Sequence, residues 1–157
     1  MQIPNNIKMV VTDFDGIFTD GSVYIDEDRK ISRKISFKDV MGVSILVKNG
    51  YKVAIISGEE NSAIKMIAEN FKLEDVYMKI RVKIDVLKQI LERHNLTPDE
   101  VLYIGDDVND KECLEFVKTK ITVQNANKKI KAIENIQITE ATGGDGAFRE
   151  VVDAIVI

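Results

Sequence analysis

The sequence predicts an α/β fold, a Rossmann-like three-layer α/β/α sandwich with a mostly parallel sheet. Short apolar segments rich in β-branched residues alternate along the chain with longer segments that carry apolar residues at helical spacing. The apolar segments also lack a polar face, which is typical of strands covered by helices on both sides. With 157 residues, 45% of them hydrophobic, the chain is long enough to bury one such core, and we expect a single domain over residues 1–157.

Six segments are predicted as strands, and they are residues 7–12, 51–57, 75–78, 101–105, 121–123 and 136–139. Six further segments are predicted as helices, over residues 39–49, 60–71, 80–94, 109–118, 127–135 and 146–157. The third of these helices has the clearest pattern, because its apolar residues form one stripe: Ile80, Ile84, Leu87, Ile90 and Leu91. This regular order of strand and helix is what predicts parallel strands.

Residues 21–37 interrupt the alternation. Two short apolar stretches, around Tyr24 and Ile31, flank a polar cluster at residues 26–30, and this pattern predicts a β-hairpin that projects from the first strand–helix connection. Two interpretations stay open. The segment is either a plain surface hairpin or, because its apolar residues have no predicted helix to rest on, a contact between subunits.

Composition excludes several classes of function. The formal net charge is -4, with acidic and basic residues interspersed, so we expect neither nucleic acid nor a membrane surface as a partner. A single cysteine, Cys113, and a single histidine, His94, are too few for a disulfide framework or a Cys/His zinc site. The first residues lack the apolar core of a signal peptide, and no apolar run approaches the ~18 residues of a membrane span, so a cytoplasmic protein is expected.

Polar groups follow three of the predicted strands at the point where each strand ends. Asp13 and Asp15 follow the first strand, Ser57 follows the second, and Asp106 and Asp107 follow the fourth. Because the carboxyl ends of parallel strands share one edge of the sheet, these groups are expected to converge on one site. Several carboxylates close together need a counter-charge, and oxygen ligands are those that Mg²⁺ prefers. The sequence therefore predicts a magnesium site at this edge.

Asp13 and Asp15 suit the chemistry of phosphoryl transfer. Residues i and i+2 at the end of a strand face the same side, so both carboxylates can meet a ligand. An ionised Asp can attack phosphorus and form an aspartyl-phosphate, while a second carboxyl lends and recovers the proton of the leaving oxygen. Ser57 and Gly58 precede a predicted helix and can hold phosphate oxygens, although a Ser there equally suits an N-cap.

Four ordered motifs resemble those of the haloacid dehalogenase (HAD) superfamily of phosphohydrolases. They span nearly the whole chain and are Asp13-Phe14-Asp15-Gly16, Ile56-Ser57-Gly58, Lys83 and Gly105-Asp106-Asp107-Val108-Asn109-Asp110. Position alone does not separate Lys83 from its basic neighbours Lys79 and Arg81, so the choice of Lys83 comes from the resemblance.

The resemblance implies a role for each matched residue. Asp13 would be the nucleophile and Asp15 the general acid/base of a two-step phosphomonoester hydrolysis. Ser57 and Lys83 would bind the transferring phosphoryl group. The implied Mg²⁺ site consists of Asp13, Asp106 and the Asp15 carbonyl, supported by Asp107 and Asp110.

The spacing of the motifs leaves no room for a cap domain. Only the hairpin and one helix fit between Asp15 and Ser57, and only a helix and a strand fit between Ser57 and Lys83. Together with the glycine-rich stretch at residues 142–150, this layout resembles a capless branch of the superfamily. That branch hydrolyses phosphates of 2-keto-3-deoxy sugar acids, namely 3-deoxy-D-manno-octulosonate 8-phosphate or nonulosonate 9-phosphates.

The same branch implies further contacts. Its members form homotetramers through the hairpin, here residues 21–37, and Gly58, Glu59 and Arg149 would help to bind the substrate. Glu59 stands where octulosonate members tend to have Arg, and it is more similar to the nonulosonate members.

Three other functions stay open from the residues. The chain could be a HAD phosphatase of other small phosphorylated metabolites, or a catalytically weak member that serves as an oligomeric binding partner. A receiver domain of a signalling system also gathers acidic residues at strand ends and binds Mg²⁺. It would require an adjacent acidic pair after the first strand and a late Lys-Pro, whereas this chain has the spaced pair Asp13 and Asp15 and no Lys-Pro.

Overall fold

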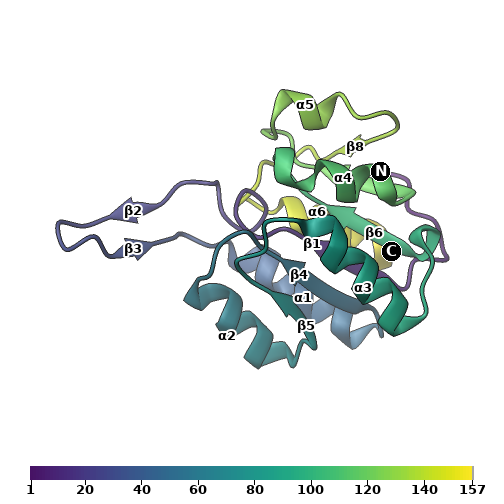
Figure 1. Ribbon diagram of the computed structural model, residues 1–157, viewed down its shortest axis with the longest axis horizontal. Coiled ribbons are helices and arrows are strands. Elements are labelled where there is room, and N and C mark those ends of the chain that lie inside the picture. Colours follow the sequence, from purple (N-terminus) through teal and green to yellow (C-terminus); the bar gives the residue numbers. More distant parts are fainter. Residues whose placement is uncertain (157) are drawn as a thin grey trace.

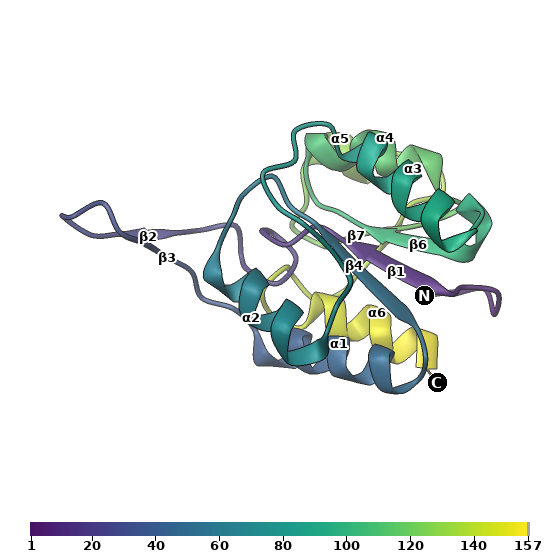
Figure 2. The ribbon, with the colours of Figure 1, turned by 60° about the horizontal axis from the view of Figure 1, so that its bottom comes forward.

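A six-stranded parallel sheet lies between two layers of helices in the computed structural model, which describes residues 1–156 (Figures 1 and 2). Its strands are β1 (Met9–Thr12), β4 (Lys52–Ile56), β5 (Asp75–Tyr77), β6 (Val101–Ile104), β7 (Thr119–Thr122) and β8 (Gln137–Ile138). They are arranged in the order β5-β4-β1-β6-β7-β8, and every neighbouring pair is parallel. The predicted fold class is therefore confirmed, with β1 at the centre of the sheet.

Helices cover both faces of the sheet, as Figure 2 shows. One face carries α1 (Phe37–Lys48), α2 (Ser62–Phe71) and α6 (Ala147–Val156), and the other carries α3 (Lys83–His94), α4 (Lys111–Phe116) and α5 (Lys128–Lys131). The last residue of the helix predicted over 146–157 lies outside the described residues. Within residues 1–156, every helix is too short or too polar to cross a membrane.

The central strand explains why the strand segments show no polar face. Val10 packs into the apolar cluster on the side of α1 and α6, whereas Met9 and Val11 pack into the cluster on the side of α3. All three side chains are fully buried. Each buried aliphatic side chain contributes roughly 1.5–3 kcal/mol of transfer free energy, so both layers hold the strand in place.

Several elements begin or end at residues other than those predicted. The helix predicted from residue 80 begins at Lys83, because the Ile80 N–H turns back to donate to the Ser57 carbonyl at 3.0 Å. The helix predicted over 109–118 covers only Lys111–Phe116, since Val108–Asp110 form a 3₁₀ turn and Val117 is extended. The helix predicted over 127–135 is a single turn. In the first case a hydrogen bond between two loops, rather than the local sequence, fixes where the helix begins.

The predicted β-hairpin is present and projects far from the body of the molecule (Figure 1). Its strands, β2 (Tyr24–Ile25) and β3 (Ile31–Ser32), pair antiparallel, with Ile25 opposite Ile31. Ile25 and Ile31 are 64% and 56% exposed, so nothing in the described chain covers the apolar residues of the hairpin.

Candidate active site

The central strands deliver their polar groups to one edge of the sheet. Asp13 follows β1 directly, Ser57 follows β4, and Asp106 follows β6 after one glycine. Because β4 and β6 flank β1 in the sheet, the three strand ends are neighbours. An open cleft of about 240 Å³ lies there, lined by Asp13, Asp15 and Asp106 among others. The predicted convergence of motifs is therefore observed.

Lys83 lies between two carboxylates inside this site. Its Nζ is 2.9 Å from Asp13 Oδ1 and 2.8 Å from Asp110 Oδ1, and its side chain has no exposed surface. Burial alone would lower the pKa of the Lys83 ammonium, but the Asp110 and Asp13 carboxylates raise it above its ordinary value. Lys83 is therefore a fixed positive charge beside Asp13. The two alternatives considered from the sequence, Lys79 and Arg81, are exposed.

Asp110 is a buried hydrogen-bond acceptor that holds several groups of the site in place. Its Oδ1 accepts hydrogen bonds from Lys83 and, at 2.8 Å, from the Tyr103 hydroxyl. Its Oδ2 accepts from the backbone N–H groups of Asp106 and Asp107 at 3.1 and 3.4 Å. Both oxygens of Asp110 are occupied in this way, so the residue supports the loop that carries Asp106 and holds Lys83 in place.

The acidic groups form a cluster suited to a metal ion. Carboxylate oxygens of Asp13, Asp106 and Asp110 all lie within 4.8 Å of one another. Burial and the neighbouring Asp110 carboxylate raise the pKa of Asp13 well above its ordinary value, and Lys83 offsets only part of this effect. Burial, followed by the Asp110 and Asp107 carboxylates, raises the pKa of Asp106 to about 7. The site thus has more negative charge than Lys83 balances.

This donor set fits a hard divalent cation. The three residues offer only carboxylate oxygens, and no nitrogen or sulfur ligand belongs to the cluster. Since Asp110 already holds Lys83 and two backbone N–H groups, Asp13 and Asp106 are the side chains left to bind an ion, with Asp110 in support. The structure therefore agrees with the predicted all-oxygen metal site.

Gly16 is required by the close approach of two loops. Its φ is +86°, and a Cβ atom at this position would lie 1.9 Å from Asp106 Oδ2. No L side chain fits there without displacing Asp106. The glycine of the first motif thus lets the β1 loop and the β6 loop meet.

Asp15 is held by two residues that the motifs did not reveal. Its Oδ1 accepts a hydrogen bond from Arg33 Nε at 3.0 Å and another from the Thr19 hydroxyl at 3.2 Å. Arg33 lies just after β3, at the base of the hairpin. The sequence does contain a signal for Arg33. In an extended segment Ile31, Arg33 and Ile35 lie on the same face, so a charged residue shares that face with apolar ones.

Ser57, Gly58 and Glu59 lie between β4 and α2. The Ser57 side chain is almost fully buried, and its hydroxyl accepts from the Glu59 N–H at 3.1 Å. A Cβ on Gly58 would lie 3.7 Å from the Asn109 side chain, which itself lines the Asp13 cleft. Glu59 instead lines a neighbouring cleft of about 570 Å³ that Arg33 also borders. Gly58 therefore lies beside a residue of the Asp13 cleft, whereas Glu59 borders a different cleft.

Two predicted residues have other partners. Arg149 donates from Nε to Asp153 at 2.7 Å, one turn along α6, and no contact in the described structure joins it to Asp13. Asp107 is exposed, and its Oδ1 accepts from the Val108 N–H at 2.7 Å and from Asn127 at 3.0 Å. The substrate-binding role of Arg149 stays a prediction.

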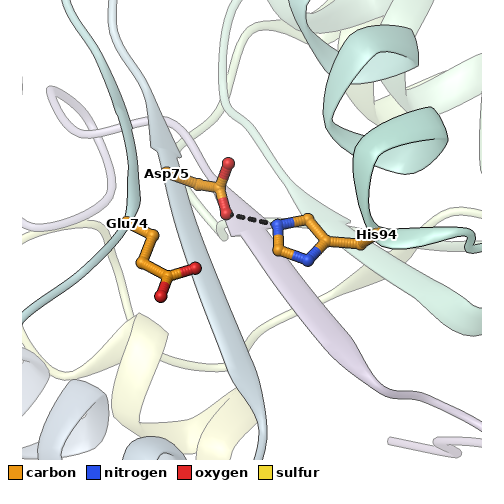
Figure 3. A group of neighbouring side chains, drawn as sticks. All are labelled: Glu74, Asp75 and His94. Carbon is orange, nitrogen blue, oxygen red and sulfur yellow. Dashed lines mark hydrogen bonds and ion pairs between the residues drawn. The ribbon is translucent and has the colours of Figure 1, made fainter.

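A second group with metal-ligand chemistry lies beside β5 and the end of α3 (Figure 3). Glu74, Asp75 and His94 bring one ligand atom each within 4.8 Å of one another. However, His94 Nε2 is 2.7 Å from Asp75 Oδ2, and Arg93 forms an ion pair with the other oxygen of Asp75. Arg93 therefore balances the charge of this buried carboxylate, and the contacts of Arg93 and His94 tie α3 to β5.

Comparisons with known proteins place the chain in a family. Residues 75–150 match the sequence family of haloacid dehalogenase-like hydrolases. The structure superposes with a TM-score of 0.91 on a protein assigned to the HAD family of hydrolases, from Streptomyces avermitilis MA-4680. The two sequences are 34% identical, and the alignment covers 99% of this chain and 89% of the other. The chain belongs to the haloacid dehalogenase-like hydrolases.

Other relatives are phosphatases. The chain is 28% identical over 151 residues to the 3-deoxy-D-manno-octulosonate 8-phosphate phosphatase KdsC of Haemophilus influenzae, covering 96% of this chain and 83% of that one. A phosphatase of the same name from Moraxella catarrhalis, crystallised with magnesium, phosphate and KDO, has a TM-score of 0.90 and 26% identity, with 97% and 87% of the two chains covered. These findings confirm the predicted superfamily and the predicted class of enzyme, a HAD-type phosphatase, and they support magnesium as its metal.

Proposed function

We propose that this HAD phosphatase hydrolyses the phosphate of a 2-keto-3-deoxy sugar acid. One observation carries the proposal: the Asp13 carboxylate, at the end of β1, is held 2.9 Å from the buried Lys83 ammonium and faces Asp106 across an open cleft. This arrangement provides a nucleophile, a fixed positive charge and an oxygen-rich cation site in one place. The similarity to KdsC phosphatases over nearly the whole chain supports the sugar acid as substrate.

The residues divide the chemistry between them. Asp13 attacks phosphorus in line and becomes the aspartyl-phosphate, while Lys83 pairs with the phosphoryl oxygens. Asp15 gives a proton to the departing sugar oxygen and then takes one from the water that cleaves the aspartyl-phosphate. Ser57 and the N–H groups that follow it hold the phosphoryl oxygens. Bound Mg²⁺ supplies positive charge that favours the charged phosphoryl group, with Asp13, Asp106 and the Asp15 carbonyl as its ligands.

The remaining predictions belong to the same proposal. Residues 1–157 would form one catalytic domain, located in the cytoplasm, and four chains would assemble through the 21–37 hairpin. Support for the assembly is the exposed apolar surface of the hairpin, which no other described part of the chain covers. A neighbouring chain would then close the open cleft that the absent cap leaves.

Phosphate release tests the proposal directly. The purified protein is assayed with 3-deoxy-D-manno-octulosonate 8-phosphate, a nonulosonate 9-phosphate and common sugar phosphates, each with Mg²⁺ and with a chelator. We expect metal-dependent turnover with a kcat/KM that is highest for one of the two sugar acids, and no turnover by Asp13→Asn. Equal, low activity on all the phosphates would refute the sugar acid as substrate, and full activity of Asp13→Asn would refute the mechanism.

Glu59 offers the test that separates the two sugar acids. It borders a cleft together with Arg33, the residue that donates to Asp15. If Glu59 selects the nonulosonate, Glu59→Arg should shift preference toward the octulosonate. An unchanged ratio of kcat/KM values would remove Glu59 from substrate recognition.

A further inference from the structure

The base of the hairpin reaches directly into the active site. Arg33 follows β3 immediately, and its Nε donates to Asp15 Oδ1 at 3.0 Å. The two side chains are 13% and 27% exposed, so this ion pair is largely withdrawn from solvent. Neighbouring Lys34, in contrast, is exposed. A charged pair that is shielded from water and joined by a hydrogen bond holds its geometry better than a surface pair.

Both donors that contact the Asp15 carboxyl group bind the same oxygen, Oδ1. The Thr19 hydroxyl donates to the same Oδ1 at 3.2 Å, and Thr19 itself is fully buried. Within residues 1–156, no protein group donates to Oδ2 of Asp15. Two donors on one oxygen fix the rotation of the carboxyl group and leave its other oxygen free for a reacting molecule.

Resting on the proposed function, we propose that Arg33 is a positioning residue that fixes the Asp15 carboxyl group so that Oδ2 carries the proton to the leaving oxygen. As the bond between phosphorus and the sugar oxygen breaks, that oxygen receives the proton from Oδ2. In the second step Oδ2 recovers a proton from water as the water oxygen bonds to phosphorus and the aspartyl-phosphate of Asp13 is cleaved. Arg33 exchanges no proton and touches no reacting atom.

The location of Arg33 also connects the hairpin with the chemistry. The residue borders the cleft of about 570 Å³ on one side and contacts Asp15 on the other. Any displacement of the hairpin base therefore moves the donor that orients the acid. A fixed acid matters most for a substrate whose leaving oxygen is a poor leaving group, because such an oxygen cannot depart without a proton.

The test compares two leaving groups in the same variants. Arg33→Met keeps the length of the side chain and removes its donor and charge, Arg33→Lys keeps the charge, and Lys34→Met is the control at the exposed neighbour. Single-turnover release of the leaving group is measured with a sugar phosphate, which needs the proton, and with p-nitrophenyl phosphate, which does not. This measurement separates formation of the aspartyl-phosphate from its later hydrolysis.

We expect Arg33→Met to release the sugar at least about 10-fold more slowly, with little change in KM and little change for p-nitrophenol. Arg33→Lys should recover part of the loss, and Lys34→Met should match the wild type. Equal loss with both leaving groups, or a loss confined to KM, would overturn the positioning role. If Arg33→Met does not fold, the same contrast in Arg33→Lys decides. Inactivity of the wild type on both phosphates would overturn the proposed function itself, and this role with it.

Discussion

The Nζ atom of Lys83 lies 2.9 Å from Oδ1 of Asp13, and the lysine side chain has no contact with solvent. The lysine begins α3, whereas the aspartate directly follows β1, so the pair joins a helix to the end of the central strand. The buried ammonium lowers the pKa of Asp13 and so offsets part of the rise that burial and the Asp110 carboxylate cause. The contact therefore links α3 and the central strand to the proposed nucleophile.

Loss of the Lys83 ammonium should remove activity. In Lys83→Met the Asp13 and Asp110 carboxylates face each other without their shared counter-charge, and the phosphoryl oxygens lose a donor. We expect kcat/KM to fall by about 10²–10³-fold, as when a donor to a developing charge is removed. Lys79→Met is the matched control, because Lys79 is 73% exposed and pairs with Glu60 rather than with a residue of the acidic cluster. A larger loss in Lys79→Met than in Lys83→Met would contradict this assignment.

A methyl group at Gly16 should disable the site. Gly16→Ala would place a Cβ against Asp106 Oδ2, in addition to the strain of a positive φ. Gly50→Ala is the matched control, since Gly50 has a φ of +82° but nothing within 4 Å of its Cβ position. Both variants should lose about 1–2 kcal/mol from backbone strain, and only Gly16→Ala should lose activity and Mg²⁺ binding. The measurements are thermal unfolding and phosphate release, and equal activities would contradict the role of Gly16.

The stability of the metal-free protein should decrease with rising pH. Asp106 has a pKa of about 7 in the folded protein, against an ordinary value of 3.8. Between these pH values the folded state holds more protons than the unfolded chain, so the free energy of unfolding falls as the pH rises, by a few kcal/mol at about 1.4 kcal/mol per unit. The raised pKa of Asp13 acts in the same direction.

Mg²⁺ should counteract this loss of stability at high pH. Because the ion competes with protons for the carboxylates, it should raise the unfolding temperature more at about pH 8 than at about pH 6. Asp106→Asn should lose most of both effects. A Mg²⁺ shift of the same size at the two pH values would show that these carboxylates do not bind the ion.

The assembly should depend on the tip of the hairpin. Ile25 and Ile31 form a cross-strand pair and are both mostly exposed. Replacing both with Lys should convert a tetramer into smaller species, as measured by light scattering after size-exclusion chromatography. Ile138→Lys, at a 44% exposed position on β8, should leave the mass unchanged. A tetramer that survives the double change would place its interface elsewhere.

Much of the site was predictable because strand ends are local features. The buried runs before Asp13, Ser57 and Asp106 identify the strands, and parallel pairing then brings their ends together. The start of α3 was predicted three residues early because the Ile80 N–H bonds to the Ser57 carbonyl instead of continuing the helix. That bond joins residues on two different loops, so no local sequence pattern predicts it.

Arg33 was missed for a related reason. Arg33 and Asp15 are 18 residues apart in the sequence, with most of the hairpin between them, so no local pattern indicates their contact. Residue type alone also could not separate Lys83 from Lys79 and Arg81. What distinguishes Lys83 is burial between Asp13 and Asp110, which only the packing of α3 against the sheet decides.

The most direct test asks whether Asp13 carries the phosphoryl group. Asp15→Asn lacks the base that activates water, so it should accumulate the aspartyl-phosphate when mixed with Mg²⁺ and p-nitrophenyl phosphate. Intact mass spectrometry of the rapidly quenched protein should show the addition of one phosphoryl group, which peptide mapping places on Asp13, and the double variant Asp13→Asn/Asp15→Asn should show none. Release of p-nitrophenol without any phosphorylated protein, or a phosphoryl group on another residue, would contradict the mechanism.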